Sequence, residues 1–204
     1  MLFRSIRVAC SEIGFFYIIN HGVPQDVIDR AMEAAAQFFA YPAEIKRQVA
    51  VNKRHRGWHA LGGATIYEAT KPDFKEFFSI GLELPEDDPC VVAGEALRGP
   101  NQWPTFMPEL RTVLAEYYVE IGKAGADLLK AVAAGLGIEQ DFFSSKYHTP
   151  LQRTQMVYYP PHPPMAEADQ FGVAPHTDYG CITLLHQDNS GDRKSTRLNS
   201  SHKT

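Results

Sequence analysis

Cysteine, long apolar runs and surplus positive charge are all scarce in this 204-residue sequence. Its three cysteines, Cys10, Cys90 and Cys181, are far apart and form no CxxC pair, so neither a disulfide framework nor a zinc ribbon is expected. A reducing, cytoplasmic location is the simplest prediction. No run of 18 apolar residues occurs, which predicts no membrane span. Lys+Arg 20 against Asp+Glu 24 gives a net charge of -4, which argues against a nucleic-acid partner.

What is present has the composition of a folded protein. Hydrophobic residues make up 44% and charged residues 22% of the chain, which excludes global disorder. Apolar periodicity predicts helices in the first part of the chain and strands afterwards. The expected helices are 1–11, one opened by Pro24 and ended by Tyr41-Pro42, a short one after Pro42, one long or two tandem helices within 106–136, and 138–145. The expected strands are 15–19, 75–84, 154–159, 171–176 and 181–186, and 85–104 is expected to be a long loop.

This order predicts an α+β chain with two structural parts and a tail. Residues 1–150 form the helical and strand region, and residues 151–192 begin a β-rich part. Residues 193–204 are basic, with no acidic residue, and their composition differs abruptly from what precedes them. They are a basic arm that binds an anionic partner, a disordered terminus, or non-native sequence joined within a domain. We expect a non-native or disordered tail.

His176-Thr177-Asp178 is the sharpest chemical motif. On an extended chain, residues i and i+2 point to the same side, so His176 and Asp178 can converge on one point. An imidazole and a carboxylate are two of the three ligands of the facial triad that holds ferrous iron. Alone, the tripeptide is a weak signal, since a surface histidine beside a solvated aspartate has the same pattern.

Three separated segments add context: 14–24 (GFFYIINHGVP), 158–161 (YYPP) and 175–185 (PHTDYGCITLL). In this order they resemble the iron- and 2-oxoglutarate-dependent oxygenases of the isopenicillin N synthase-like superfamily. The resemblance spans about residues 5–191. It implies a jelly-roll (double-stranded β-helix) core, incomplete in this chain, with an N-terminal helical region packed on it.

The resemblance also implies site residues and cofactors. His176 and Asp178 would be iron ligands, and the hydroxyl of Tyr159 would bond a carboxylate of the co-substrate or substrate. Fe(II), 2-oxoglutarate and O2 would be the cofactor and co-substrates, and the partner a small organic molecule; the oligomeric state is left open. In many plant members an asparagine precedes the two tyrosines, where this chain has Val157, and Tyr159 alone is carried over.

Two family features have no counterpart in the sequence: a later histidine as third iron ligand, and an Arg-x-Ser for 2-oxoglutarate. His186 and His202 do not fit the pattern. His21 is expected to bond backbone in a turn, and His55 and His59 to lie in a solvated loop or a substrate lid. The charged residues Lys71, Asp73, Lys75 and Glu76 are expected to form a solvated face.

Three functions follow as hypotheses. The first is a dioxygenase that oxidises a small organic substrate and releases succinate and CO2, with an ethylene- and succinate-forming or isopenicillin N synthase-type oxidase as variants. The second is a non-catalytic fragment, because two ligands hold iron more weakly than three. The third is a basic-tail binding module. The 204-residue chain itself is expected to be inactive.

Overall fold

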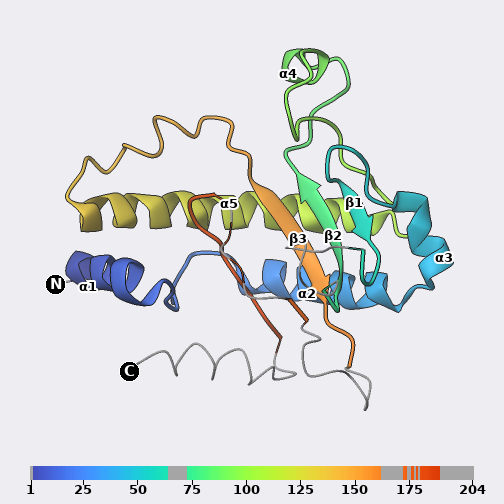
Figure 1. The fold of residues 1–204 in the computed structure, drawn as a ribbon, viewed down its shortest axis with the longest axis horizontal. Coiled ribbons are helices and arrows are strands. Elements are labelled where there is room, and N and C mark those ends of the chain that lie inside the picture. Colours follow the sequence, from blue (N-terminus) through green and yellow to red (C-terminus); the bar gives the residue numbers. More distant parts are fainter. Residues whose placement is uncertain are drawn as a thin grey trace.

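The computed structural model describes residues 2–63, 73–161, 172–173, 176, 178 and 180–188 (Figure 1). The helical elements are α1 (Leu2–Val8), a π-helical turn (Ala9–Ile13), α2 (Gln25–Ala40), α3 (Ala43–Lys46), a 3-10 turn (Arg47–Val49), α4 (Pro89–Val92) and α5 (Glu109–Leu136). The strands are β1 (Gly57–His59), β2 (Glu76–Gly81) and β3 (Arg153–Tyr158). None of the helices in this described part combines the length and hydrophobicity that a membrane span needs.

The three strands form one antiparallel sheet with β2 in the middle, in the order β1-β2-β3. Trp58 of β1 lies opposite Phe78, and Phe78 lies opposite Met156 of β3. All three side chains are buried, so one face of the sheet is apolar. Because side chains alternate along a strand, the residues next to them point to the other face.

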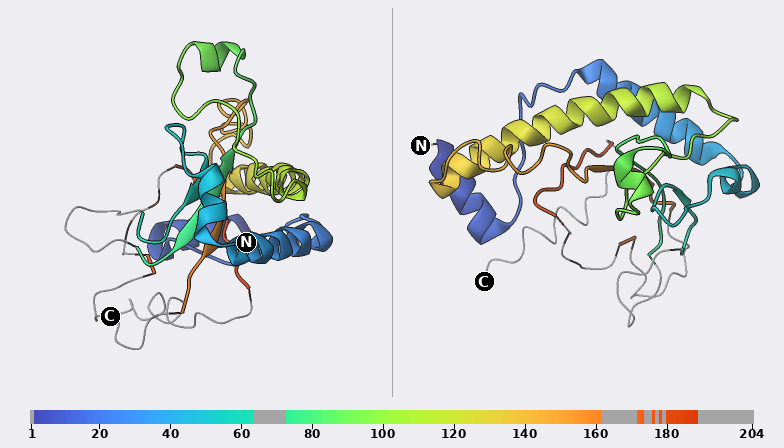
Figure 2. Two further views of the ribbon diagram at one scale, coloured as in Figure 1. Left: turned by 90° about the vertical axis from the view of Figure 1, so that its right-hand side faces the viewer. Right: turned by 90° about the horizontal axis from the view of Figure 1, so that it is seen from above.

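Two long helices cover the apolar face. α1 and α2 both pack along α5, and α2 and α5 lie on the same side of the sheet (Figures 1 and 2). α5 runs without a break for 28 residues and ends at Gly137, whose φ of 75° is the left-handed conformation that closes many helices. The sequence left open one helix or two here, and the structure has one.

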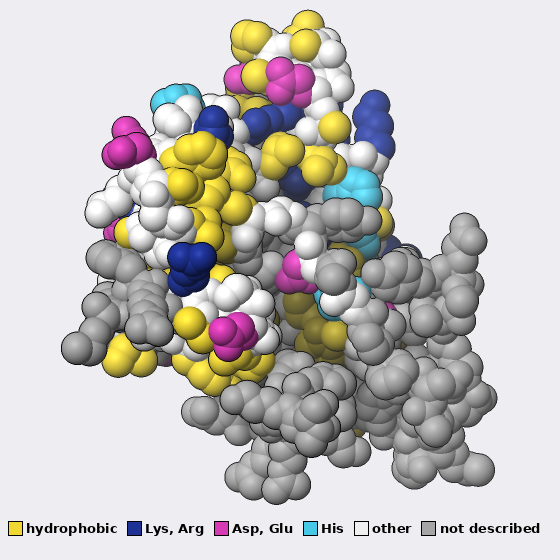
Figure 3. All heavy atoms as spheres, turned by 60° about the vertical axis from the view of Figure 1, so that its left-hand side comes forward, with side chains coloured by type: hydrophobic (Ala, Val, Ile, Leu, Met, Phe, Trp, Pro, Cys, Tyr) yellow, Lys and Arg dark blue, Asp and Glu magenta, His cyan; other side chains and the backbone are white. Residues whose placement is uncertain are grey.

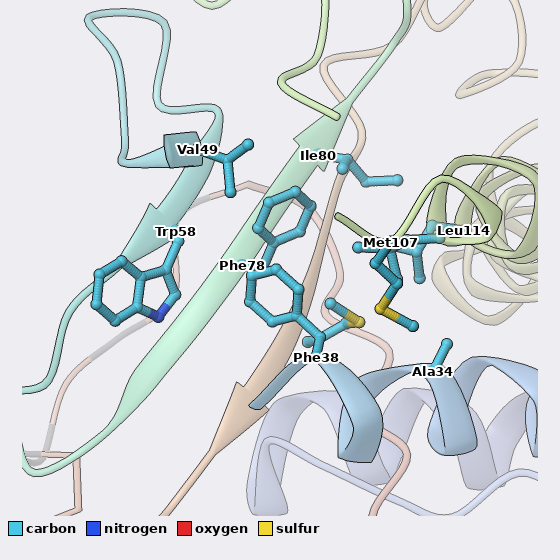
Figure 4. Close-up of a cluster of buried hydrophobic side chains, with 10 residues drawn as sticks. Ala34, Phe38, Val49, Trp58, Phe78, Ile80, Met107 and Leu114 are labelled. Carbon is cyan, nitrogen blue, oxygen red and sulfur yellow. The ribbon is translucent and has the colours of Figure 1, made fainter. Parts of the chain in front are cut away.

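The main core fills the space between the sheet and these helices (Figure 4). Phe38 of α2 contacts Phe78 of β2 with ring centroids 4.9 Å apart, and both side chains are almost fully buried. Burying a phenylalanine stabilises the fold by roughly 1.5–3 kcal/mol. The other buried members of this cluster are Ala34, Val49, Trp58, Ile80, Met107, Leu110, Leu114 and Met156.

A buried charged network joins four elements beside this core. The Lys46 ammonium donates to the carbonyl of Phe39 at 3.1 Å and to Glu76 Oε1 at 2.9 Å. The indole Nε1 of Trp58 donates to the other oxygen of the same carboxylate at 2.6 Å. The ammonium also lies 5.3 Å from the centroid of the Trp58 ring, a cation–π distance. The network therefore ties the end of α3 to α2, β1 and β2.

The prediction of a strand over residues 15–19 is wrong. These residues form no strand, and Tyr17 and Ile19 are 78% and 83% exposed. A short apolar run becomes a strand only where a neighbouring strand accepts its backbone hydrogen bonds. Among the described residues no strand lies beside it. The segment instead connects the π-helical turn, closed by Gly14 with a φ of 89°, to α2.

Two further predictions in the second half differ from the structure. Residues 138–145 form successive turns rather than a helix, and Ile138 and Phe142 are exposed, so no packing holds a helix there. Residues 181–186 form no strand either. The methyls of Ile182 and Leu184 instead approach Gly125 of α5. Half of the strand predicted at 171–176 lies outside the described residues, and the described residues 172, 173 and 176 are not in a strand. Residues 193–204 lie wholly outside the described residues.

Several elements agree with the sequence. The helix after Pro24 ends at Tyr41, β2 lies within the predicted 75–84, and β3 matches the predicted 154–159 to within one residue. The predicted loop over 85–104 contains the one-turn helix α4, whose Asp88 side chain caps the backbone N–H of Cys90 at 2.9 Å. Helices packed on a small antiparallel sheet agree with the predicted α+β class. The three described strands do not amount to a jelly roll, and an incomplete jelly roll stays a prediction.

Candidate metal centre

His176 and Asp178 face each other. The imidazole Nε2 lies 2.9 Å from Asp178 Oδ1, and the two side chains are 30% and 52% exposed. Both residues are outside any described helix or strand. The side chains converge, although neither residue lies in the extended strand from which the convergence was predicted.

The pair has donors and spacing that suit a divalent metal ion. Histidine nitrogen and aspartate oxygen bind such ions at roughly 2.1 Å, so two neighbouring ligands at a right angle lie about 3 Å apart. The observed Nε2–Oδ1 distance of 2.9 Å matches that separation. A direct ion pair between the two side chains has the same separation, so the pair supplies the donors and spacing of two metal ligands.

A third ligand is not found among the described residues. No group of three or more His, Cys, Asp or Glu side chains in that part of the chain is placed to hold a metal ion. His186, which is exposed, therefore does not complete the pair. His21 bonds backbone as predicted, because its Nδ1 accepts from the N–H of Val23 at 3.2 Å. His202 lies outside the described residues.

Tyr159 directly follows β3 and is 52% exposed. Its ring lies against Gly172, where a Cβ atom would stand 2.9 Å from Tyr159 Cδ1. Gly172 precedes His176 by four residues. The structure thus brings Tyr159 next to the segment that leads to the candidate ligands, and its exposed ring is not part of the core.

The sheet has a second face, turned away from the helices, which we call the outer face. By alternation it carries His59 of β1, Phe77 of β2, and Arg153 and Val157 of β3. Tyr159 continues the same series by two residues. Sequence reasoning missed this face, although the alternation from Arg153 to Tyr159 is readable in the sequence.

His59 is neither in a lid nor in a solvated loop, contrary to expectation. It ends β1 and stacks on Phe77 with ring centroids 4.0 Å apart and planes at 15°. Burial, and then the positive charges of His55, Arg153 and Lys75, lower the pKa of His59 to about 4. The imidazole is therefore neutral near pH 7.

The expected solvated face at 71–76 is also wrong for the residues described there. The side chains of Asp73, Lys75 and Glu76 are 1%, 15% and 12% exposed. Asp73 pairs with Lys75 at 3.0 Å, and Glu76 pairs with Lys46 at 2.8 Å. Each charge is buried with an opposite charge, which offsets the loss of hydration. Lys71 lies outside the described residues.

Family profiles match both parts of the chain. Residues 1–106 match the family model for the N-terminal region of the non-haem dioxygenase in morphine synthesis. Residues 150–201 match the model of the 2OG-Fe(II) oxygenase superfamily. The first match covers more than half of the chain. The chain therefore belongs to the 2OG-Fe(II) oxygenases, enzymes that use Fe(II) as cofactor and 2-oxoglutarate and O2 as co-substrates.

Curated relatives agree. The chain is 35% identical over 193 residues to the 2-oxoglutarate-Fe(II) type oxidoreductase hxnY of Emericella nidulans, covering 92% of this chain and 55% of that protein. It is 34% identical over 189 residues to azadirone synthase LFS of Melia azedarach, covering 90% and 56%. The chain thus spans a little over half the length of these relatives.

Solved structures share the fold. A Caulobacter crescentus protein described as of the 2OG-Fe(II) oxygenase family matches with a TM-score of 0.60 and 29% identity, over 72% of this chain and 47% of that one. A full-length Neurospora crassa protein in complex with alpha-KG matches with a TM-score of 0.71 and 24% identity, over 87% and 55%. At 24% identity the second match supports the fold alone.

Proposed function

We propose that the complete protein is an Fe(II)- and 2-oxoglutarate-dependent dioxygenase that oxidises a small organic substrate and releases succinate and CO2. The observation that carries this proposal is the 2.9 Å approach of His176 Nε2 to Asp178 Oδ1 in a chain of this family. When bound, ferrous iron supplies the redox chemistry, in which one oxygen atom of O2 enters the substrate and the other enters succinate.

The chain's own residues have separate roles in this proposal. His176 and Asp178 hold the iron from one side and leave its remaining positions to a third ligand, the co-substrate and O2. The Tyr159 hydroxyl donates a hydrogen bond to a carboxylate of the co-substrate or substrate. Tyr159 lies against Gly172, which precedes His176 by four residues, so its ring adjoins the segment that carries the two ligands.

Metal binding tests the ligand assignment in the 204-residue chain. Mn(II), added in place of Fe(II) to avoid oxidation, should bind weakly, as expected for two protein ligands. His176→Ala and Asp178→Ala should each weaken this binding at least tenfold, as measured by electron paramagnetic resonance. The matched control is His186→Ala, an exposed histidine eight residues after Asp178, which should bind as the parent does. Unchanged Mn(II) binding in both ligand variants would refute the assignment.

Succinate formation tests the activity. Resequencing the source nucleic acid across Gly191–Arg193 shows whether the reading frame continues, and the protein from the complete gene should convert 2-oxoglutarate to succinate in a His176-dependent manner. The 204-residue chain alone should form no succinate, because only two iron ligands are identified in it. A complete protein that binds the metal but forms no succinate would contradict the proposed function.

A further inference from the structure

The outer face of the sheet carries two stacked rings, of which Phe77 is buried and His59 is partly exposed. His59 stacks on Phe77, and the register places Val157 directly opposite Phe77 on the next strand. Val157 is 39% exposed, and His59 is partly exposed. A neutral imidazole stacked on a phenyl ring, with an aliphatic side chain beside it, favours a planar apolar ligand.

One end of this surface carries an unpaired positive charge. Arg153 is exposed, and it has no hydrogen-bonded or ionic partner among the described residues. Lys75, which precedes β2 at the end away from Arg153, is already paired with Asp73 at 3.0 Å and lies over the Phe77 ring. Arg153 is therefore the side chain of this face that can accept an anion, and its fork of N–H groups suits a carboxylate.

Charge and surface lie close enough to act on one molecule. The register places Arg153 opposite Gly81, four residues along β2 from Phe77, and the charge of Arg153 is one of the causes that lower the pKa of His59. From Arg153 to Val157 the strand advances about 13 Å, and it reaches Tyr159 after about 20 Å. The arginine side chain spans part of the shorter distance, and one or two fused rings span the rest.

We propose that the outer face binds a planar aromatic carboxylic acid, with its carboxylate on Arg153 and its ring on the His59–Phe77 stack. The far end of the ligand then points along β3 toward Val157 and Tyr159. The assignment of this ligand as the substrate rests on the proposed function, whereas the binding site itself does not.

A carboxylate on Arg153 has two possible sources, the substrate and 2-oxoglutarate. The stacked rings favour the first, because 2-oxoglutarate has no ring to lie on them. The two sources are separated by titrating 2-naphthoate, its uncharged analogue 2-naphthamide, and 2-oxoglutarate into the metal-free 204-residue chain, followed by the NMR signals of the His59 ring.

Arg153→Gln should weaken 2-naphthoate binding at least tenfold and leave 2-naphthamide binding unchanged, since only the acid uses the guanidinium. His59→Leu should weaken both ligands, and signal dispersion shows whether that variant is folded. Arg111→Gln, an exposed arginine on α5, is the matched control and should bind as the parent does.

The proposal is overturned if 2-naphthoate does not bind, binds no better than the amide, or binds equally to Arg153→Gln. It is also overturned if 2-oxoglutarate displaces 2-naphthoate and itself depends on Arg153, because the charge then serves the co-substrate. Acid binding that depends on Arg153, together with absent succinate formation by the complete protein, would retain the site and refute the proposed function.

Discussion

At the scale of single residues, the ammonium of Lys46 shows how a buried charge is accommodated. Its side chain is 5% exposed and that of Glu76 is 12% exposed. The carboxylate is shared with Trp58, so both of its oxygens have partners. Burying such a pair costs hydration, but removing one member costs more, because the other charge is then left alone in the core.

Lys46→Met should therefore destabilise the protein by about 3–5 kcal/mol, as measured by urea unfolding. The matched control is Arg30→Met, which breaks the pair with Glu116 at 2.7 Å between side chains that are both 42% exposed. That change should destabilise the protein far less, because water screens an exposed ion pair. Equal losses in the two variants would contradict the importance of burial.

The same residues show what sequence can and cannot predict. The convergence of His176 and Asp178 was predicted from their spacing on an extended chain, and the two side chains do converge, although neither residue lies in a described strand. The burial of Asp73, Lys75 and Glu76 was not, because the partner of Glu76 is 30 residues earlier in the chain. A local run of charges reads as a solvated surface unless the distant partner is known.

At the scale of elements, two glycines of α5 contact the segments on either side of the candidate site. One segment follows Asp178, and the other precedes β3. A Cβ on Gly125 would lie 3.6 Å from Leu184 Cδ1, in ordinary contact, in the segment after Asp178. A Cβ on Gly122 would lie 2.6 Å from Gln152 Oε1, just before β3. Gln152 also donates to the carbonyl of Tyr118 at 2.7 Å. The first glycine has room for a methyl group and the second does not.

Gly125→Ala should stabilise the protein by about 0.5–1 kcal/mol, because alanine favours the helix and its methyl group fits. Gly122→Ala gains the same helix propensity but displaces Gln152, and the lost hydrogen bond costs about 0.5–1.5 kcal/mol. Its net effect should be near zero or destabilising. Urea unfolding of the two variants measures the difference, and equal stabilisation by both would show that Gln152 moves freely.

Element prediction succeeded where the local pattern was sufficient. α2 and α5 carry their own periodic apolar stripes and their own ends, at Tyr41 and Gly137. The runs 15–19 and 181–186 are apolar and were predicted to be strands, yet they form none. A strand depends on backbone partners elsewhere in the chain, which a single apolar run does not reveal.

At the scale of the whole molecule, the described surface exposes many large hydrophobic side chains, visible as yellow patches in Figure 3. Several come from one stretch, 13–19, including Ile13, Phe15, Tyr17 and Ile19. Contiguous exposed apolar side chains favour association with other surfaces. The chain also spans only 55% of the length of its relative hxnY.

The 204-residue chain should therefore self-associate as its concentration rises, as measured by sedimentation velocity. The double variant Tyr17→Ser/Ile19→Ser should reduce this association, because it removes two of the most exposed apolar side chains of the stretch. Val92→Ser is the matched control: Val92 is 73% exposed but lies on α4, far from that stretch in the sequence. A monomer at all concentrations would contradict the prediction.

Because β2 lies between two strands, its backbone amides should exchange with solvent more slowly than those of α4. The backbone amides of Phe77 to Ile80 are bonded within the sheet and lie beneath the main core, so hydrogen exchange there requires the whole domain to unfold. α4 protrudes from the sheet (Figure 1), and Val91 is its one buried residue. Its amides can exchange through local opening, and the loop around it is where proteases should cut first and where an inserted sequence would disturb the fold least.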